Sequence, residues 1–213
     1  NIKWSGKRTI AIIGVKTLQE TKYKIMFDRI EAGTYMIASA LTAGNIKIIN
    51  IIPKIIKTEI DILRKVGATI KIKNTELRII GKKKINHIKL TTSPYPGFPT
   101  DLQAQLMVLL CKAFGRSEII EKIFENRFMH ASELNRMGAK IKILENKAII
   151  EGNVNFKAAE LMATDLRASV SLILAGLTAK GKSLINRIYH LDRGYESIEQ
   201  KLKSLGAKIK RIS

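Results

Sequence analysis

The sequence is poor in several residue types, and each shortage excludes a class of protein. Its single cysteine, Cys111, has no disulfide partner and lies in an apolar run, so we expect it to fill core volume. The three histidines stand apart from one another and from Cys111, which excludes the ligand spacing typical of a metal site. No apolar run approaches the roughly 20 residues that cross a bilayer, and no signal-peptide pattern opens the chain. We therefore expect a cytoplasmic protein without a membrane partner.

Acidic residues are scarce compared with basic ones. The chain has 18 Asp and Glu against 38 Lys and Arg, which leaves a net charge of +20. Such a charge raises nucleic acid as a partner, because Lys and Arg neutralise phosphates. Here the lysines are spread along alternating strands such as Ile70-Lys71-Ile72-Lys73, and the few aromatic residues are not interleaved with them. We favour a solvated surface and no nucleic-acid partner, while a repeat protein that binds RNA through exposed sheets stays open as an alternative.

A threefold internal repeat dominates the chain. Three stretches end alike: Leu63-Arg-Lys-Val-Gly67-Ala-Thr-Ile-Lys71, Leu134-Asn-Arg-Met-Gly138-Ala-Lys-Ile-Lys142 and Leu202-Lys-Ser-Leu-Gly206-Ala-Lys-Ile-Lys210. A helix that closes on glycine and runs into an alternating strand, at a period of roughly 70 residues, indicates one supersecondary unit built three times. We place the repeats at about 28–95, 96–160 and 161–213.

Each repeat also opens alike, on an aspartate followed by an apolar run that ends in glycine. The three runs are Asp28 to Gly44, Asp101 to Gly115 and Asp165 to Gly181. Their spacing predicts helices that are buried over most of their surface. A β-rich run follows each one, at 46–52, 118–124 and 183–189, and then the amphipathic helix that closes the repeat. One repeat therefore reads helix, strand, helix, strands.

Three arginines lie near the starts of predicted helices, at Arg127, Arg167 and Arg193. Helix N-termini attract anions, and a guanidinium adds a bidentate fork that suits phosphate or carboxylate. If these ends converge, they form an anion-binding face. Alternatively, each arginine only pairs with a neighbouring aspartate, Asp165 with Arg167 and Asp192 with Arg193, and spacing alone favours this second interpretation.

The segment before Asp101 is stiffened, because three of the four prolines lie between Pro94 and Pro99. It delivers Asp101 to the mouth of a helix with little conformational freedom. A carboxylate held in this way could remove a proton from a substrate hydroxyl. It could equally be a helix N-cap, and spacing alone favours the cap.

Four motifs, in this order, resemble the bacterial UDP-N-acetylglucosamine enolpyruvyl transferases. They are Phe98-Pro-Thr-Asp-Leu-Gln-Ala-Gln105, Phe124-Glu-Asn-Arg-Phe-Met-His130, Met162-Ala-Thr-Asp-Leu-Arg-Ala-Ser169 and Ile188-Tyr-His-Leu-Asp-Arg-Gly-Tyr-Glu196. The resemblance covers nearly the whole chain. The shikimate-pathway enolpyruvyl transferases share the fold and are the alternative, but the second and third motifs resemble the UDP-sugar family.

The resemblance implies an α/β fold, an inside-out α/β barrel of three βαβαββ units with buried helices. It implies transfer of the enolpyruvyl group of phosphoenolpyruvate to the 3-hydroxyl of UDP-N-acetylglucosamine, the first committed step of peptidoglycan synthesis, with no metal or organic cofactor. Residues 1–20 would be the last strand of a partner domain, and residues 21–213 a linker and the three-unit domain. The partner domain, which carries the family's catalytic cysteine, is absent from the chain, so the resemblance implies an inactive fragment.

The resemblance also implies roles for six residues. Asp101 matches the aspartate that contacts the sugar hydroxyl and is proposed as the base, and Ile123 matches a position that touches the UDP-sugar. Four more lie toward the phosphoenolpyruvate end of the cleft: Arg127 and Arg193 at the phosphate, with Asp165 and Arg167 close by.

Overall fold

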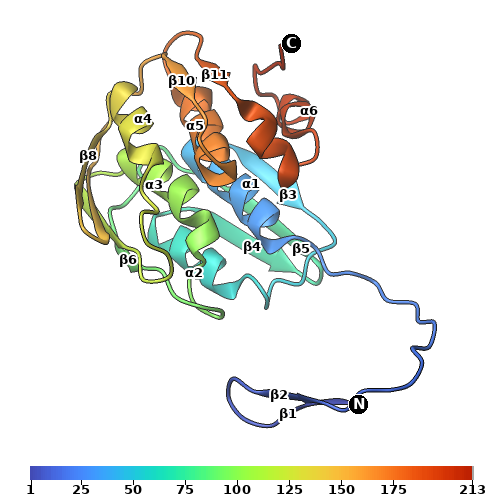
Figure 1. Ribbon diagram of the computed structural model, residues 1–213. Coiled ribbons are helices and arrows are strands. Elements are labelled where there is room, and N and C mark those ends of the chain that lie inside the picture. The colour runs from blue at the N-terminus through green and yellow to red at the C-terminus, as the bar shows by residue number, and fades with distance from the viewer. Residues whose placement is uncertain (213) are drawn as a thin grey trace.

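The computed structural model describes residues 1–212, and its helices and strands repeat along the chain (Figure 1). The first unit contains α1 (Arg29–Leu41), β3 (Asn45–Ile48), α2 (Lys57–Lys65), β4 (Thr69–Lys73) and β5 (Glu76–Ile80). The second contains β6 (Lys89–Thr91), the 3-10 helix η1 (Thr100–Leu102), α3 (Gln103–Cys111), β7 (Arg116–Ile120), α4 (His130–Arg136), β8 (Lys140–Leu144) and β9 (Lys147–Glu151). The third contains β10 (Glu160–Met162), α5 (Leu166–Thr178), β11 (Leu184–Asn186), the 3-10 helix η2 (Ile188–Arg193) and α6 (Ile198–Ser204).

The first α-helices of the three units form the core. In Figure 1, α1, α3 and α5 lie side by side at the centre, and α3 contacts both of the others. Every residue of α3 is buried, which its apolar sequence explains. The sheets lie outside this core with one face toward it: Leu77 and Ile79 are fully buried, while Arg78 between them is exposed. This confirms the expected α/β fold with buried helices.

One hydrogen-bonding pattern closes the second helix of each unit. The amide of the residue after the glycine donates to the carbonyl of the leucine five positions earlier, always at 3.0 Å. The pairs are Ala68 with Leu63, Ala139 with Leu134, and Ala207 with Leu202. The intervening glycines have φ of +110°, +94° and +98°, a left-handed conformation that favours glycine. The sequence repeat is therefore a repeat of three-dimensional structure.

The three units carry unequal sheets. Their strand orders are β3-β5-β4, β6-β7-β9-β8 and β10-β11. Because β6 pairs in parallel with β7, it belongs to the second unit, and that unit begins before residue 96. The predicted strand around Ile209 and Lys210 is wrong, since residues 207–212 form no strand. In the other units the matching strands, β4 and β8, each pair with the strand that follows them, whereas residues 207–212 pair with no strand of the described chain.

The N-terminal segment forms an antiparallel hairpin of β1 (Ile2–Trp4) and β2 (Ile10–Ile12). Figure 1 shows it apart from the three units, at the end of an extended connection. Its apolar side chains are uncovered, with Trp4 70% exposed and Ile12 69% exposed. That residues 1–20 complete a partner domain stays a prediction. Among the described residues, no helix is both long enough and apolar enough for a membrane span.

Candidate active site

An aspartate lies at the start of the first helical segment of each unit, and only one of the three caps no helix. Asp28 and Asp165 each accept hydrogen bonds from the amides two and three positions ahead, at 2.7 to 3.1 Å. Asp101 instead lies within η1, and its carboxylate makes no capping bond. The N-cap interpretation is therefore confirmed for Asp28 and Asp165 and wrong for Asp101. The Asp101 carboxylate is therefore available to side chains from elsewhere in the chain.

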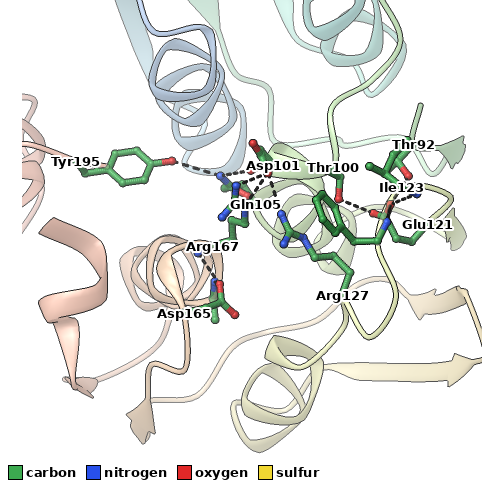
Figure 2. Close-up of polar contacts among 12 residues, drawn as sticks. Thr92, Thr100, Asp101, Gln105, Glu121, Ile123, Arg127, Asp165, Arg167 and Tyr195 are labelled. Atoms are coloured by element: carbon green, nitrogen blue, oxygen red, sulfur yellow. Dashed lines mark hydrogen bonds and ion pairs between the residues drawn. The ribbon is translucent and has the colours of Figure 1, made fainter. Parts of the chain in front are cut away.

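That carboxylate is held by two guanidinium groups (Figure 2). Arg127 Nη2 donates to Asp101 Oδ1 at 2.8 Å. Arg167 contacts the same oxygen through Nε at 2.7 Å and Nη2 at 2.5 Å. Such a charge-assisted fork fixes the carboxylate group firmly. Oδ2 has no hydrogen bond from any residue in 1–212, and a third of the Asp101 side chain is exposed. The site thus presents one carboxylate oxygen and two cations at the surface.

The turn that carries Asp101 is held in place by packing against α1. Pro99 precedes η1 with φ −72°, the value that the proline ring imposes, and it is buried. Leu102 is fully buried beside Gly33 of α1, where a Cβ atom would lie 2.4 Å from Leu102 Cδ1. Gln105 Nε2 donates to the carbonyl of Asp101 at 3.0 Å. The rigid presentation expected from the prolines is therefore reinforced by tight packing on α1.

A buried polar network behind Asp101 joins all three units. Tyr195, after η2, has its hydroxyl 2.8 Å from the Thr34 hydroxyl of α1. Gln105 Nε2 lies 3.2 Å from Thr34 Oγ1 and 3.4 Å from the Tyr195 hydroxyl. Burial raises the pKa of Tyr195, so its phenol keeps its proton and can donate. These contacts fix α1, α3 and the third unit relative to one another beneath the site.

The two arginines lie close enough to interact with each other. Burial lowers the pKa of Arg127 from its ordinary value, and the charge of Arg167 lowers it further. The Arg127 guanidinium also stacks over the Phe124 ring, with 4.8 Å to the ring centroid. The alternative in which Arg167 pairs with Asp165 is wrong: Asp165 binds the backbone amide of Arg167, and the guanidinium binds Asp101. Two partly buried cations around one carboxylate favour an anionic ligand.

Arg193 does not join this cluster through any contact among the described residues. It is exposed at the end of η2, and the adjacent Gly194 packs against Leu166 at the start of α5. The alternative in which Arg193 pairs with Asp192 is also wrong. Asp192 instead binds Arg211 through two hydrogen bonds of 3.0 Å and 2.6 Å, which lower the pKa of that carboxyl. The role of Arg193 at the phosphate end stays a prediction.

Ile123 is half-buried in the loop between β7 and α4. Its amide is bound by Glu121, a residue that the sequence did not single out. Glu121 accepts a hydrogen bond of 2.7 Å from the Ile123 amide and lies buried beside it. The alternation of β7 could have revealed it. Ser117 and Ile119 face inward, so the residue two positions further along the strand falls on the same face.

Two other titratable groups near the core are structural. Cys111 is buried, and burial raises the pKa of its thiol to about 12, so it stays protonated and unreactive. His130 is buried behind Arg127, and burial lowers its pKa to about 4. Its imidazole is therefore neutral at neutral pH. Within residues 1–212 no three or more His, Cys, Asp or Glu side chains gather in a group that could hold a metal ion.

Known proteins are similar to this sequence over nearly all of its length. The family model described as EPSP synthase (3-phosphoshikimate 1-carboxyvinyltransferase) matches residues 1–202. The chain is 71% identical over 213 residues to the UDP-N-acetylglucosamine 1-carboxyvinyltransferase of Pelagibacter ubique (strain HTCC1062). This alignment covers 100% of the chain and 51% of the relative. The chain belongs to the enolpyruvyl transferase family. A second protein of the same name, from Magnetococcus marinus, is 51% identical to the chain. That alignment covers 99% of the chain and 51% of the relative.

Solved structures agree on the enolpyruvyl transferase fold. The enolpyruvyl transferase NikO from Streptomyces tendae superposes with a TM-score of 0.88 at 28% identity, over 99% of this chain and 51% of that one. EPSP synthase from Acinetobacter baumannii superposes with a TM-score of 0.79 at 20% identity, over 100% of this chain and 53% of that one. The chain thus spans about half the length of the curated relatives it matches, and it corresponds to their C-terminal part.

Proposed function

We propose that this chain is the C-terminal part of an enzyme that transfers the enolpyruvyl group of phosphoenolpyruvate to the 3-hydroxyl of UDP-N-acetylglucosamine and releases phosphate. The reaction opens peptidoglycan synthesis in the cytoplasm and so serves cell-wall biogenesis, cell shape and cell division. The observation that carries the proposal is that Asp101 caps no helix and instead binds Arg127 and Arg167. The chain that contains this arrangement is 71% identical to a UDP-N-acetylglucosamine 1-carboxyvinyltransferase.

Asp101 has the geometry of a base for the sugar hydroxyl. Both guanidinium groups occupy Oδ1, which leaves Oδ2 for the hydroxyl proton. As that proton moves to Oδ2, the hydroxyl oxygen bonds to C2 of phosphoenolpyruvate, and C3 takes a proton to form a tetrahedral intermediate. Loss of a C3 proton and of inorganic phosphate then yields the enol ether. Ile123, on the loop beside this turn, contacts the UDP-sugar by packing or through its backbone.

The arginines supply fixed positive charge to anionic substrates. Arg127 and Arg193 serve the phosphate of phosphoenolpyruvate, and Arg167 lies close by with its backbone fixed by Asp165. Preorganised donors of this kind stabilise charge that develops in the transition state without reorganising. Neither a metal nor an organic cofactor takes part in this scheme.

The remaining catalytic groups belong to a partner domain that this chain does not include. An intermediate with cationic or tetrahedral character would react with water, so two lobes that close over the substrates protect it. The relatives are about twice as long as this chain, which supports a second lobe. We therefore expect the 213-residue chain alone to be inactive.

The proposal is tested by turnover in the full-length protein that carries this chain. With both substrates present, we expect release of inorganic phosphate that requires UDP-N-acetylglucosamine. The acceptor of the shikimate-pathway enzymes, shikimate 3-phosphate, serves as the comparison, and we expect no turnover with it. Phosphate release with shikimate 3-phosphate and none with UDP-N-acetylglucosamine would reverse the assignment.

A further inference from the structure

Glu121 is a buried carboxylate at one edge of the second sheet. It follows β7 directly, and Thr92 follows the parallel neighbour β6 in the same register. Only 3% of Glu121 and none of Thr92 is exposed. A carboxylate is costly to bury unless hydrogen bonds satisfy it, so its partners indicate why it is there.

Four donors converge on this carboxylate (Figure 2). Oε1 accepts from the Thr92 hydroxyl at 2.7 Å and from the backbone amides of Ile123 and Phe124 at 2.7 Å and 3.3 Å. Oε2 accepts from the Thr100 hydroxyl at 2.8 Å. Thr92 Oγ1 also accepts from the amide of Lys122 at 3.0 Å. The amides of three consecutive loop residues thus end on this carboxylate or on its threonine partner.

The two carboxylate oxygens reach two different parts of the candidate site. Oε1 holds the loop that carries Ile123, while Oε2 holds Thr100, the residue directly before Asp101. A single planar group bridges the two segments, so a shift of one segment is transmitted to the other. We propose that Glu121 is a positioning residue that sets the distance between Asp101 and Ile123. This inference rests on the proposed function, in which both residues contact the nucleotide sugar.

Two substitutions at Glu121 in the full-length protein test this inference. Glu121→Ala leaves four donors without an acceptor, and we expect KM for UDP-N-acetylglucosamine to rise by about tenfold or more while KM for phosphoenolpyruvate stays within about twofold. Glu121→Gln is the conservative variant. Its amide oxygen can accept from the three donors at Oε1, and its NH₂ can donate to the Thr100 hydroxyl. We therefore expect the KM of this variant for UDP-N-acetylglucosamine to stay close to the wild-type value.

Ser117→Ala is the matched structural control. Ser117 is fully buried on β7, the strand that Glu121 follows, and it accepts a hydrogen bond of 3.3 Å from the Ile88 amide, away from the site. We expect this control to lower thermal stability and to leave both KM values unchanged. An unchanged KM for the nucleotide sugar in Glu121→Ala, or an equal rise in both KM values, would overturn the proposal. If Glu121→Ala does not fold, Thr100→Val removes only the Oε2 contact, and the same two outcomes apply.

Hydrogen exchange separates this inference from the proposed function. If the wild-type protein shows no transfer to UDP-N-acetylglucosamine, the proposed function fails, but the coupling by Glu121 can still be measured. We expect the amides of Ile123 and Phe124 to exchange faster in Glu121→Ala and at the wild-type rate in Ser117→Ala. Equal protection of these amides in Glu121→Ala and the wild type would overturn the coupling itself.

Discussion

Individual residues at equivalent positions of the repeat have taken different tasks. Asp28 and Asp165 satisfy amides at the start of α1 and α5, whereas Asp101 is free to bind two arginines. Sequence spacing could not distinguish the three, because each is an aspartate before an apolar run. The deciding contacts come from Arg127 and Arg167, which are 26 and 66 residues away from Asp101 along the chain. A tertiary interaction of this kind leaves no local signal.

The capping difference predicts different effects on stability. Asp28→Ala removes an acceptor from two amides at the start of α1, so we expect it to lower the free energy of unfolding by about 1 kcal/mol. Asp28→Asn keeps a capping oxygen and serves as its control. Urea unfolding measures both variants. A loss in Asp28→Asn as large as that in Asp28→Ala would show that the cap is not the cause.

Buried His130 predicts a loss of stability in acid. Its pKa is about 4 in the folded protein and about 6.5 when unfolded, so between these values only the unfolded chain binds the proton. The free energy of unfolding should therefore fall as the pH drops through this window, by about 3 kcal/mol at about pH 4. Urea unfolding at several pH values compares the wild type with His130→Met, which cannot titrate there. Parallel pH profiles for the two proteins would contradict the assignment.

At the scale of elements, the sequence predicted what depends on local rules. The second helices of the three units end at the predicted glycines, and α1 and α5 begin at their capping aspartates. The short helix η1 just before α3 was not predicted, because nothing in the local spacing shows that Leu102 packs against Gly33 of α1. The strand around Ile209 failed for a similar reason: alternation marks a strand, but only pairing forms one.

The contact between α1 and η1 predicts a sensitive glycine. A Cβ atom at Gly33 would lie 2.4 Å from Leu102 Cδ1, so Gly33→Ala must displace the Leu102 side chain, which is fully buried. We expect a loss of about 1–3 kcal/mol in the free energy of unfolding. Gly176→Ala in α5 is the matched control, since its nearest neighbour would be 3.8 Å away, and alanine favours helix. Equal stabilities for the two variants in thermal or urea unfolding would refute the packing argument.

Across the whole molecule, the positive charge of the outer strands is separate from the arginines of the candidate site. The lysines of the outer strands, such as Lys71, Lys73 and Lys142, are exposed as predicted and lie on several sheets rather than in one cluster. The site instead lies where α3 and α5 begin, beside the turns before them, and its guanidinium groups come from two different units. Because the resemblance rested on motifs at these turns, it identified Asp101, Arg127 and Arg167 together, although spacing alone did not favour their contact.

The measurement that most directly tests this account is the turnover of Asp101→Asn in the full-length protein, beside the wild type and with thermal unfolding of both. Asparagine keeps the shape of the side chain but removes its ability to take the hydroxyl proton. We predict that kcat with UDP-N-acetylglucosamine and phosphoenolpyruvate falls by about 10²- to 10⁴-fold while the protein remains folded. A folded Asp101→Asn protein that turns over at the wild-type rate would contradict the central claim that this carboxylate serves the transfer.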